Sequence, residues 1–448
     1  MAEGFSSRAL RLGLGLALIG VGSCSSSGGG SGDAACGGGE CKLIASDAAV
    51  NDIFGLGVAL SGDALVVGSP QDDDNGETSG SAYVYRQDGN DWEAEQKLVA
   101  SDGAEFDRFG GSVAIDGDLI VVGASTAGGV AAGAAYVFRL VGTRWVEEAK
   151  LTASDGAADD LFGRAVDVDG DVIVVGAQQA DGSGASSGAA YVYRLVAMTW
   201  VEENKIVAAD AAEGDFFGVS VSVSGDAVLV GATGSDDAGN ESGAAYVYRF
   251  DGTNWLQEQK ILAMRDAIDP ILRPGCEVPG PKPDGFARDR FGLSVAIDGD
   301  KLAVGADGTE FRLQSTGCNR FPRGNNIGAI YVYLLNAAVW EFEQKLEAPD
   351  FEPELALGRS VSLDGDVLAS GTKGDRTNGL NAGSAYVFRF DGMEWSSDVT
   401  KDKLLASDGV EFDFFGNSIG VSGDSLVVGA YGADDKGPLS GSAYVYGL

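Results

Sequence analysis

The chain has 448 residues, with 67 Asp or Glu against 31 Lys or Arg, and its formal net charge is -36. A negative field of this strength repels phosphates, so a nucleic acid is not expected as a partner. The chain contains no histidine. This excludes Ser-His-Asp triads, Cys-His pairs and metal sites with imidazole ligands.

The first 23 residues have the pattern of a signal peptide. Arg8 and Arg11 precede an apolar run, residues 12–21, which is too short to span a bilayer as a stable helix. Residues 21–24, VGSC, are similar to a bacterial lipobox. We therefore expect Cys24 to become the first mature residue and to carry acyl chains that hold an exported protein at the outer membrane or cell surface. The alternative is ordinary signal cleavage nearby.

The next segment, residues 24–41, is rich in Ser and Gly and is predicted to be a flexible tether. Cys36 and Cys41 flank a glycine-rich turn in it and could pair locally. An even number of remaining cysteines in an exported chain favours disulfides, so Cys276 and Cys318 are expected to pair as well. The alternatives are free thiols or a metal site, although the spacings fit no zinc motif.

From Lys42 onwards the chain repeats one pattern seven times. Each unit has a Phe-Gly pair, a run of alternating large and small residues, a Gly-Asp turn, an apolar run that ends in Gly-Ala, and a tyrosine-rich run. Such self-similarity indicates that one supersecondary unit is repeated. The Phe-Gly pairs begin at Phe54, Phe109, Phe162, Phe217, Phe291 and Phe415, and Leu357 takes the sixth place in order.

Each unit is predicted to contain four strands, as the second unit shows. Residues 112–115 alternate with period two, and residues 119–122 form an apolar run that needs cover on both faces. Residues 135–138 and 145–151 are rich in aromatic and β-branched residues, and the Gly-Asp pairs favour hairpin turns. Seven four-stranded units predict an all-β protein, a seven-bladed β-propeller with antiparallel strands.

These units resemble FG-GAP repeats, the blades of integrin α-subunit propellers. They are most similar to the bacterial branch, with the motifs K-L-x-A-S-D-G, D-x-F-G, V-V-G-A and G-x-A-Y-V-[YF] across residues 42–448. The resemblance implies a propeller that is usually extracellular and non-enzymatic. Integrin-type calcium sites lie in a D-x-D-x-D-G loop between the first two strands. Here that connection is a short turn, and the nearest sequence, residues 167–171, lies on a predicted strand, so those sites are not carried over.

The repeat begins and ends out of phase. Residues 42–47 have the pattern of a fourth strand with no third strand before it, and the chain stops after a third strand at residues 444–446. The first segment is therefore predicted to complete the last blade and close the ring. Both ends would then lie on the face with short turns. We expect the tether to leave from that face and the opposite face, with long loops, to point away from the membrane.

Two Asp-bearing motifs recur in the long connections. One is S-D-G-x-x-x-D-x-F-G, with Asp102 and Asp107 as examples. Carboxylates at close spacing can bind Ca²⁺, but Asp also caps turns by bonding its own backbone. Recurrence in nearly every unit favours capping; calcium remains the alternative, and no cofactor is required. The second motif lies between the second and third strands and contains Asp72, Asp73, Asp74, Asp236, Asp237, Asp434 and Asp435.

The long-loop face is the expected ligand face, because function concentrates on loops held by a rigid scaffold. The fifth unit carries two insertions, residues 268–288 and 309–326, which form either a ligand site or a solvated surface. We expect a monomeric, non-catalytic surface propeller that binds a protein or a glycan. A polysaccharide hydrolase with an Asp pair, or a structural envelope protein, is the alternative. The basic residues of the insertions are Arg273, Lys282, Arg288, Arg312, Arg320 and Arg323.

Overall fold

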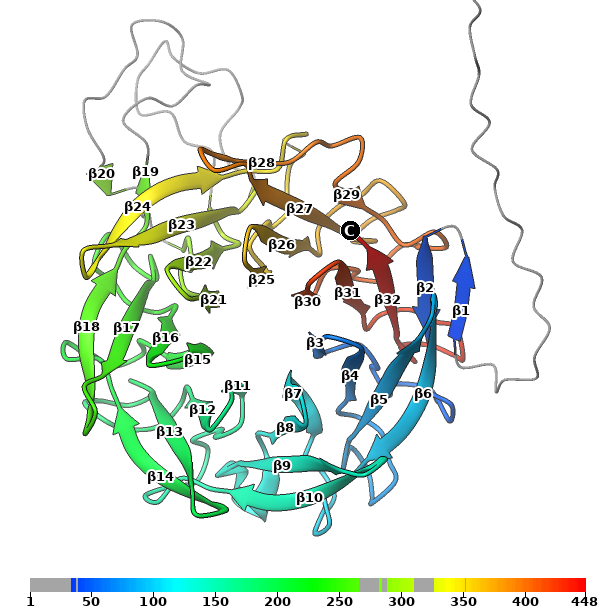
Figure 1. The fold of residues 1–448 in the computed structure, drawn as a ribbon, viewed down its shortest axis with the longest axis horizontal. Coiled ribbons are helices and arrows are strands. Elements are labelled where there is room, and N and C mark those ends of the chain that lie inside the picture. Colours follow the sequence, from blue (N-terminus) through cyan, green and yellow to red (C-terminus); the bar gives the residue numbers. More distant parts are fainter. Residues whose placement is uncertain (1–33, 38, 266–281, 284–287, 310–325, 351) are drawn as a thin grey trace, which may run out of the picture. The chain divides into compact units, whose positions relative to one another are not determined.

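The computed structural model describes residues 34–37, 39–265, 282–283, 288–309, 326–350 and 352–448, and it shows a closed ring of seven blades (Figure 1). In each blade the first strand lies nearest the centre of the ring and the fourth lies at the outside. The predicted all-β, seven-bladed propeller with antiparallel strands is confirmed. No helix in the described residues is both long and apolar enough to cross a membrane.

Blades 1 to 4 are regular four-stranded sheets. Blade 1 contains β3 (Val58–Ser61), β4 (Ala64–Ser69), β5 (Ser81–Asp88) and β6 (Asp91–Leu98). Blade 2 contains β7 (Phe109–Asp116), β8 (Leu119–Ala124), β9 (Ala134–Val141) and β10 (Arg144–Leu151), with the short π-helix η1 (Ala127–Ala131) before β9. Blade 3 contains β11 (Ala165–Asp169), β12 (Val172–Ala177), β13 (Ala189–Val196) and β14 (Thr199–Ile206). Blade 4 contains β15 (Phe217–Ser224), β16 (Ala227–Ala232), β17 (Ala244–Phe250) and β18 (Trp255–Ile261).

Blade 5 is also a regular four-stranded sheet, whereas blades 6 and 7 depart from this pattern in their outer parts. Blade 5 contains β21 (Ser294–Asp298), β22 (Lys301–Ala306), β23 (Ala329–Asn336) and β24 (Val339–Leu346), and the small pair β19 (Met264–Arg265) and β20 (Lys282–Pro283) precedes it. Blade 6 contains β25 (Ser360–Asp364), β26 (Val367–Thr372) and β27 (Ser384–Phe390), and its outer strand is divided into β28 (Trp395–Ser396) and β29 (Lys403–Leu404). Blade 7 contains β30 (Ser418–Ser422), β31 (Ser425–Ala430), β32 (Ser442–Gly447), β2 (Glu40–Leu43) and β1 (Ala34–Gly37).

The ring closes in blade 7 as the sequence predicts. β2 pairs antiparallel with β32, placing Glu40 opposite Tyr446 and Leu43 opposite Ala443. Leu43 is fully buried there. The pairing begins at Glu40, two residues before the predicted start of the propeller at Lys42.

β1 changes the expected path of the chain before the propeller. It lies within the predicted tether and pairs antiparallel with β2, placing Ala34 opposite Leu43. Cys36 lies opposite Cys41 and is disulfide-bonded to it. Because the hairpin reverses the chain, β1 begins level with the long-loop face, so the expectation that this segment leaves from the short-turn face is wrong. The derived expectation that the long-loop face points away from the membrane loses its support.

The Phe-Gly pairs join neighbouring blades. The amide of Phe109 donates to the carbonyl of Ser79 in blade 1 at 3.0 Å, and its ring packs edge-on against Tyr136 at 5.4 Å between centroids. Gly110 has φ +95°, and a Cβ on Gly68 would lie 1.9 Å from its carbonyl oxygen. Only glycine fits such an approach, which explains the glycines of both F-G and V-V-G-A.

A second ring of hydrogen bonds joins the blades on the short-turn face. The residue before each turn glycine is Asp or Ser, and its side chain accepts the amide of the turn glycine in the next blade. Because the last bond returns to blade 1, these contacts close the ring independently of β2. The bonded pairs are Ser61–Gly117, Asp116–Gly170, Asp169–Gly225, Ser224–Gly299, Asp298–Gly365, Asp364–Gly423 and Ser422–Gly62.

Asp167 occupies an inner-strand position where other blades carry small residues. Its carboxylate accepts the amide of Val223 in the next blade at 2.8 Å. The hydroxyl of Ser222 makes the matching bond to Ile297 at 3.2 Å. Burial raises the pKa of Asp167 to about 6. A carboxyl whose pKa is higher in the folded chain destabilises the fold once ionised, so this cost grows as the pH rises from about 4 to about 6.

Replacing Asp167 by serine is expected to stabilise the protein at neutral pH. The serine hydroxyl can keep the bond between blades without the buried charge, so Asp167→Ser should raise the free energy of unfolding by about 1–2 kcal/mol at pH 7.5. The gain should be about 1 kcal/mol smaller at pH 5.0, where the wild-type carboxyl is largely protonated. Urea unfolding at the two pH values measures this difference. An equal gain at both pH values would contradict the titration of Asp167, and Ser222→Ala provides a control without a titrating group.

Candidate functional site

The second aspartate of the S-D-G-x-x-x-D-x-F-G motif caps a turn, as predicted. Asp107 accepts the amide of Ala104 at 2.9 Å and is almost fully buried. Side-chain oxygens at this spacing satisfy backbone groups that a turn would otherwise leave unpaired. The same bond is made by Asp52, Asp160, Asp215 and Asp413.

The first aspartate of the motif belongs to a Tyr-Asp-Lys cluster. The hydroxyl of Tyr136 donates to Asp102 at 2.8 Å, and the ammonium of Lys150 donates to the same carboxylate at 2.7 Å while lying over the tyrosine ring. The bonds from Lys150 lower the pKa of Asp102. Equivalent aspartates in the other described clusters are Asp47, Asp155, Asp210, Asp350 and Asp408.

Aspartates of the predicted calcium loops also accept hydrogen bonds from the loop backbone. Asp73 accepts the amide of Thr78 at 2.7 Å and so closes the loop between the second and third strands. In the same blade, Asp72 accepts the amide of Asp74 at 3.1 Å. These bonds explain why Asp recurs at these places without any ligand. Asp236 and Asp434 make the same bond as Asp73, to Glu241 and Leu439.

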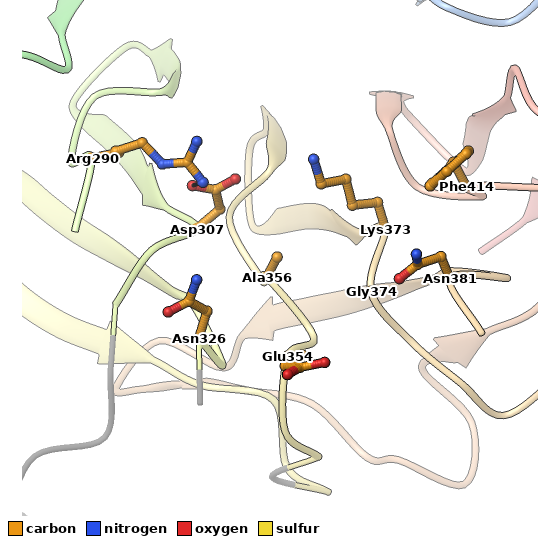
Figure 2. A pocket seen from close by; sticks show the side chains of 9 residues that line it. All are labelled: Arg290, Asp307, Asn326, Glu354, Ala356, Lys373, Gly374, Asn381 and Phe414. Atoms are coloured by element: carbon orange, nitrogen blue, oxygen red, sulfur yellow. Dashed lines mark ion pairs between the residues drawn. The ribbon is translucent and has the colours of Figure 1, made fainter. Parts of the chain in front are cut away.

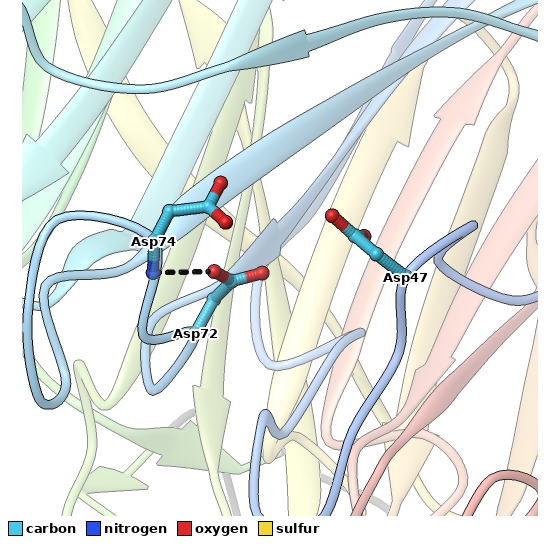
Figure 3. A group of neighbouring side chains, drawn as sticks. All are labelled: Asp47, Asp72 and Asp74. Carbon is cyan, nitrogen blue, oxygen red and sulfur yellow. Dashed lines mark hydrogen bonds between the residues drawn. The ribbon is translucent and has the colours of Figure 1, made fainter.

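The remaining loop aspartates surround a lysine. Asp47, Asp72 and Asp74 point into one space (Figure 3), with carboxylate oxygens within 4.8 Å of one another. The ammonium of Lys97 lies between them, at 2.7, 3.0 and 2.5 Å respectively. An ion bound among these carboxylates would have to displace that ammonium, and calcium binding stays a prediction. Asp237 and Asp435 contact Lys260 and Lys42 in the same way.

Most of the predicted basic set lies outside the described residues, as do Cys24, Cys276 and Cys318. This applies to Arg273, Arg312, Arg320 and Arg323, and only the backbone of Lys282 is described, in β20. Arg288 is exposed on the long-loop face, where its carbonyl oxygen lies against Gly308.

A pocket of about 470 Å³ lies on the long-loop face where blades 5, 6 and 7 meet. Figure 2 shows Arg290 beside Asp307 at one side, Lys373 in the middle and Phe414 at the other side. Three blades therefore contribute to one site. The lining residues are Arg290, Asp307, Asn326, Glu354, Ala356, Lys373, Gly374, Asn381 and Phe414.

The loops that begin after β22 and β26 position the two central charges. Asp307 and Lys373 are the first residues after these strands, and each is followed by a glycine. The amide of Gly374 donates to the carbonyl of Leu355 at 3.1 Å, and a Cβ on this glycine would lie 1.8 Å from the carbonyl oxygen of Glu354. The glycine thus allows the loop to press against the preceding connection, which holds Lys373 at the inner rim.

The pocket has an excess of positive charge. Asp307 is fully buried, with Arg290 at 2.7 Å and Arg359 at 3.9 Å. Burial raises the pKa of Asp307, although Arg290, Arg359 and Lys373 act in the opposite direction. Burial and the two arginines lower the pKa of Lys373, which has no ion pair within 4.0 Å in the described part of the chain. In the described residues, three cations therefore surround Asp307, while Glu354, the other carboxylate that lines the pocket, is paired with Arg376.

Further arginines extend this charge along the inner rim. Arg164 lies directly before β11 and is exposed to solvent in part. Burial of the rest of its side chain and the positive charges of Arg359 and Arg108 lower the pKa of Arg164. Arg108 and Arg164 come from blades 2 and 3, whereas Arg359 comes from blade 6. They flank Phe-Gly pairs, or the Leu-Gly pair that replaces one, so the blade repeat brings them to the same rim.

Aromatic side chains from blade 7 border the pocket. Phe414, one of its lining residues, stacks on Tyr431 with centroids 5.1 Å apart and an interplanar angle of 8°. Phe412 lies 6.2 Å from Phe414 and is 44% exposed. The long-loop face thus presents an accessible aromatic surface beside the cations.

A family model described as FG-GAP repeat matches seven consecutive segments of this sequence. They are residues 38–85, 92–138, 145–193, 200–248, 282–333, 340–388 and 399–446. The chain belongs to the FG-GAP repeat family. Most of its FG-GAP units start at the outer strand of one blade and end in the third strand of the next, so a unit spans a junction between blades. None of the curated proteins compared with this FG-GAP chain matches it.

Proposed function

We propose that this FG-GAP propeller is a non-catalytic binding protein that recognises a protein or glycan through its long-loop face. The observation that supports this is the cationic pocket beside exposed aromatic rings on a protein whose net charge is -36. Elsewhere on this face, lysines such as Lys97 and Lys150 are neutralised by aspartates of the fold. Lys373 is held close to other cations instead.

The described carboxylates of the pocket do not suit a hydrolase site. Glycoside hydrolysis requires one carboxyl as a proton donor and another as a base or nucleophile. Asp307 is buried against arginines, and Glu354 forms an ion pair with Arg376. Both carboxylates that line the pocket are therefore committed to guanidinium groups, which supports binding rather than acid-base chemistry.

The N-terminal pattern supports export and anchoring. The signal-like segment and the lipobox-like VGSC sequence favour acylation at Cys24, with the propeller displayed on the cell envelope. The mass of the mature N-terminal peptide tests this step, because acyl chains add a defined mass to Cys24.

The binding role is tested with the full chain on glycan and protein arrays. We expect at least one ligand, with binding at least tenfold weaker for Phe412→Ala and unchanged for Val339→Ala. The two side chains are similarly exposed, at 44% and 49%, but Val339 begins β24 beside a turn on the short-turn face. Absence of any ligand, or equal loss in both variants, would contradict the proposal. Release of reducing sugar from a bound polysaccharide would contradict the non-catalytic role.

A further inference from the structure

We propose that the pocket between blades 5, 6 and 7 binds the carboxylate of an acidic sugar that carries one negative charge. This inference rests on the proposed binding function and names its ligand class. It is carried by the charges around Asp307, where Arg290, Arg359 and Lys373 outnumber the carboxylate, by the pairing of Glu354 with Arg376, and by the polar and aromatic lining of the pocket.

The charges of the pocket favour a ligand with a single negative charge over a polyanion. Arg290 and Arg359 share the buried Asp307, which leaves the site with more positive than negative charge. A carboxylate can accept N–H donors from a guanidinium and from an ammonium, and Arg290 and Lys373 both line the pocket. A polyanion would be repelled by the rest of a chain with net charge -36, whereas a single carboxylate can be attracted locally.

Lys403, in the same blade as Lys373, shows what a structural lysine looks like here. Its ammonium lies 2.6 Å from Asp350 and 2.7 Å from Asp375. Lys373 has no carboxylate within 4.0 Å in the described ranges, although it is partly buried. Holding a lysine near arginines without such a partner destabilises the fold, and a ligand that supplies the missing negative charge would remove this cost.

The remaining lining suits a sugar ring. Asn326 and Asn381 offer amide donors and carbonyl acceptors for hydroxyl groups. Phe414, stacked on Tyr431, offers a flat apolar surface for the C–H face of a ring. A volume of about 470 Å³ falls in the range of roughly 300–1,000 Å³ that is typical of small-molecule sites. A ligand of one or two sugar rings therefore fits both the size and the chemistry of the site.

The test is calorimetric titration of the full chain with a disaccharide that contains one glucuronic acid. Its matched probe is the same disaccharide with the carboxylate reduced to an alcohol. We expect the acidic form to bind at least tenfold more tightly than the reduced form. Lys373→Met should weaken binding of the acidic form at least tenfold and have little effect on the reduced form, because it removes one ammonium and keeps an apolar stem.

Lys436→Met is the matched control. Lys436 is exposed on the same face in blade 7 and has no ion pair in the described residues. The Lys436→Met variant removes one positive charge away from the pocket. Its affinity for the acidic disaccharide should therefore stay within twofold of that of the wild-type chain. Equal weakening in both variants would reduce the effect to general electrostatics and overturn the site. Circular dichroism and thermal unfolding verify that both variants fold.

Two other outcomes overturn the inference while the proposed function stands. One is array binding of neutral glycans or proteins that is unaffected by Lys373→Met. The other is Lys373-dependent binding of an acidic peptide without binding of the uronic acid, which would assign the pocket to a protein carboxylate. A chain that binds nothing on the arrays instead contradicts the proposed function itself.

Discussion

A chain that begins at Asp47 is expected to be less stable than the full chain by at least about 4 kcal/mol, because it lacks β2. Leu43 and Ala45 are buried, and burial of one leucine alone contributes about 1.5–3 kcal/mol. Lys42 lies 2.6 Å from both Asp408 and Asp435. Its loss leaves these carboxylates facing each other. Differential scanning calorimetry of the two chains measures the change.

A chain that begins at Gly39 is the control for this truncation. It keeps β2 but removes β1 and with it the disulfide between Cys36 and Cys41, which closes a loop of very few residues. A loop this short restricts the unfolded chain little, so the control should lose no more than about 1–2 kcal/mol. Similar stability of both truncated chains would show that β2 does not close the ring energetically.

Replacing Lys97 by methionine is expected to lower the free energy of unfolding by about 3 kcal/mol. Burial lowers the pKa of Lys97, but hydrogen bonds to Asp47, Asp74 and Asp72 raise this pKa by more. The lysine is therefore charged throughout the neutral range. The variant leaves these three carboxylates within 4.8 Å of one another without a cation. Urea unfolding at pH 7.5 measures the loss.

Lys150→Met is the control for this prediction. It measures how much one exposed ion pair contributes to the free energy of unfolding, for comparison with the cluster of three carboxylates around Lys97. Lys150 contacts Asp102, which is 54% exposed, so its replacement should cost less than about 1 kcal/mol. Added Ca²⁺ should recover part of the stability of Lys97→Met and leave the wild-type chain unchanged, because only the variant has an open space among carboxylates. Equal losses in both variants, or Ca²⁺ stabilisation of the wild type, would contradict the role given to Lys97.

The same lysine-aspartate contacts determine how stability depends on pH. The pKa of Asp47 is lowered because the bonds from Lys97 and Tyr83 outweigh the effect of burial. A lowered carboxyl pKa contributes stability above the unfolded value of about 3.9, and this contribution disappears as the pH falls through the folded value. The raised pKa of Lys97 contributes stability that is fully present below the unfolded value of about 10.4. This stability is lost as the pH rises through the folded value.

The repeat made the fold predictable, because each local signal occurs seven times. The Phe-Gly pairs, the short turns and the unpaired fourth strand at the N-terminus led to the blade number and to closure. β1 was not predicted, since Ala34–Gly37 lies in a Ser/Gly-rich segment with no strand pattern. The division of the outer strand of blade 6 was not predicted either, because an insertion around residues 398–401 breaks the strand without changing the repeat.

The pocket was not predictable from local sequence. Arg290, Lys373 and Phe414 are far apart in the chain and meet only because three blades converge on one rim. The signal was present: in blades 2, 3, 5 and 6 a cation stands directly beside the Phe-Gly pair, or beside the Leu-Gly pair that replaces it, and Lys373 directly follows the second strand of blade 6. The sequence favoured capping for the Asp-rich loops, with calcium as the alternative, but did not predict that Lys97, Lys260 and Lys42 contact their carboxylates.

The closure in blade 7 makes the position of the chain ends arbitrary. Gly447, at the end of β32, lies next to Glu40, at the start of β2, much as the third and fourth strands of any other blade meet at their turn. A circular permutant that joins Leu448 to Gly39 through a short linker and opens the chain between β5 and β6 would keep every blade intact. The molecule could thus carry fusions or labels at the seam of another blade, with new termini on the face opposite the pocket.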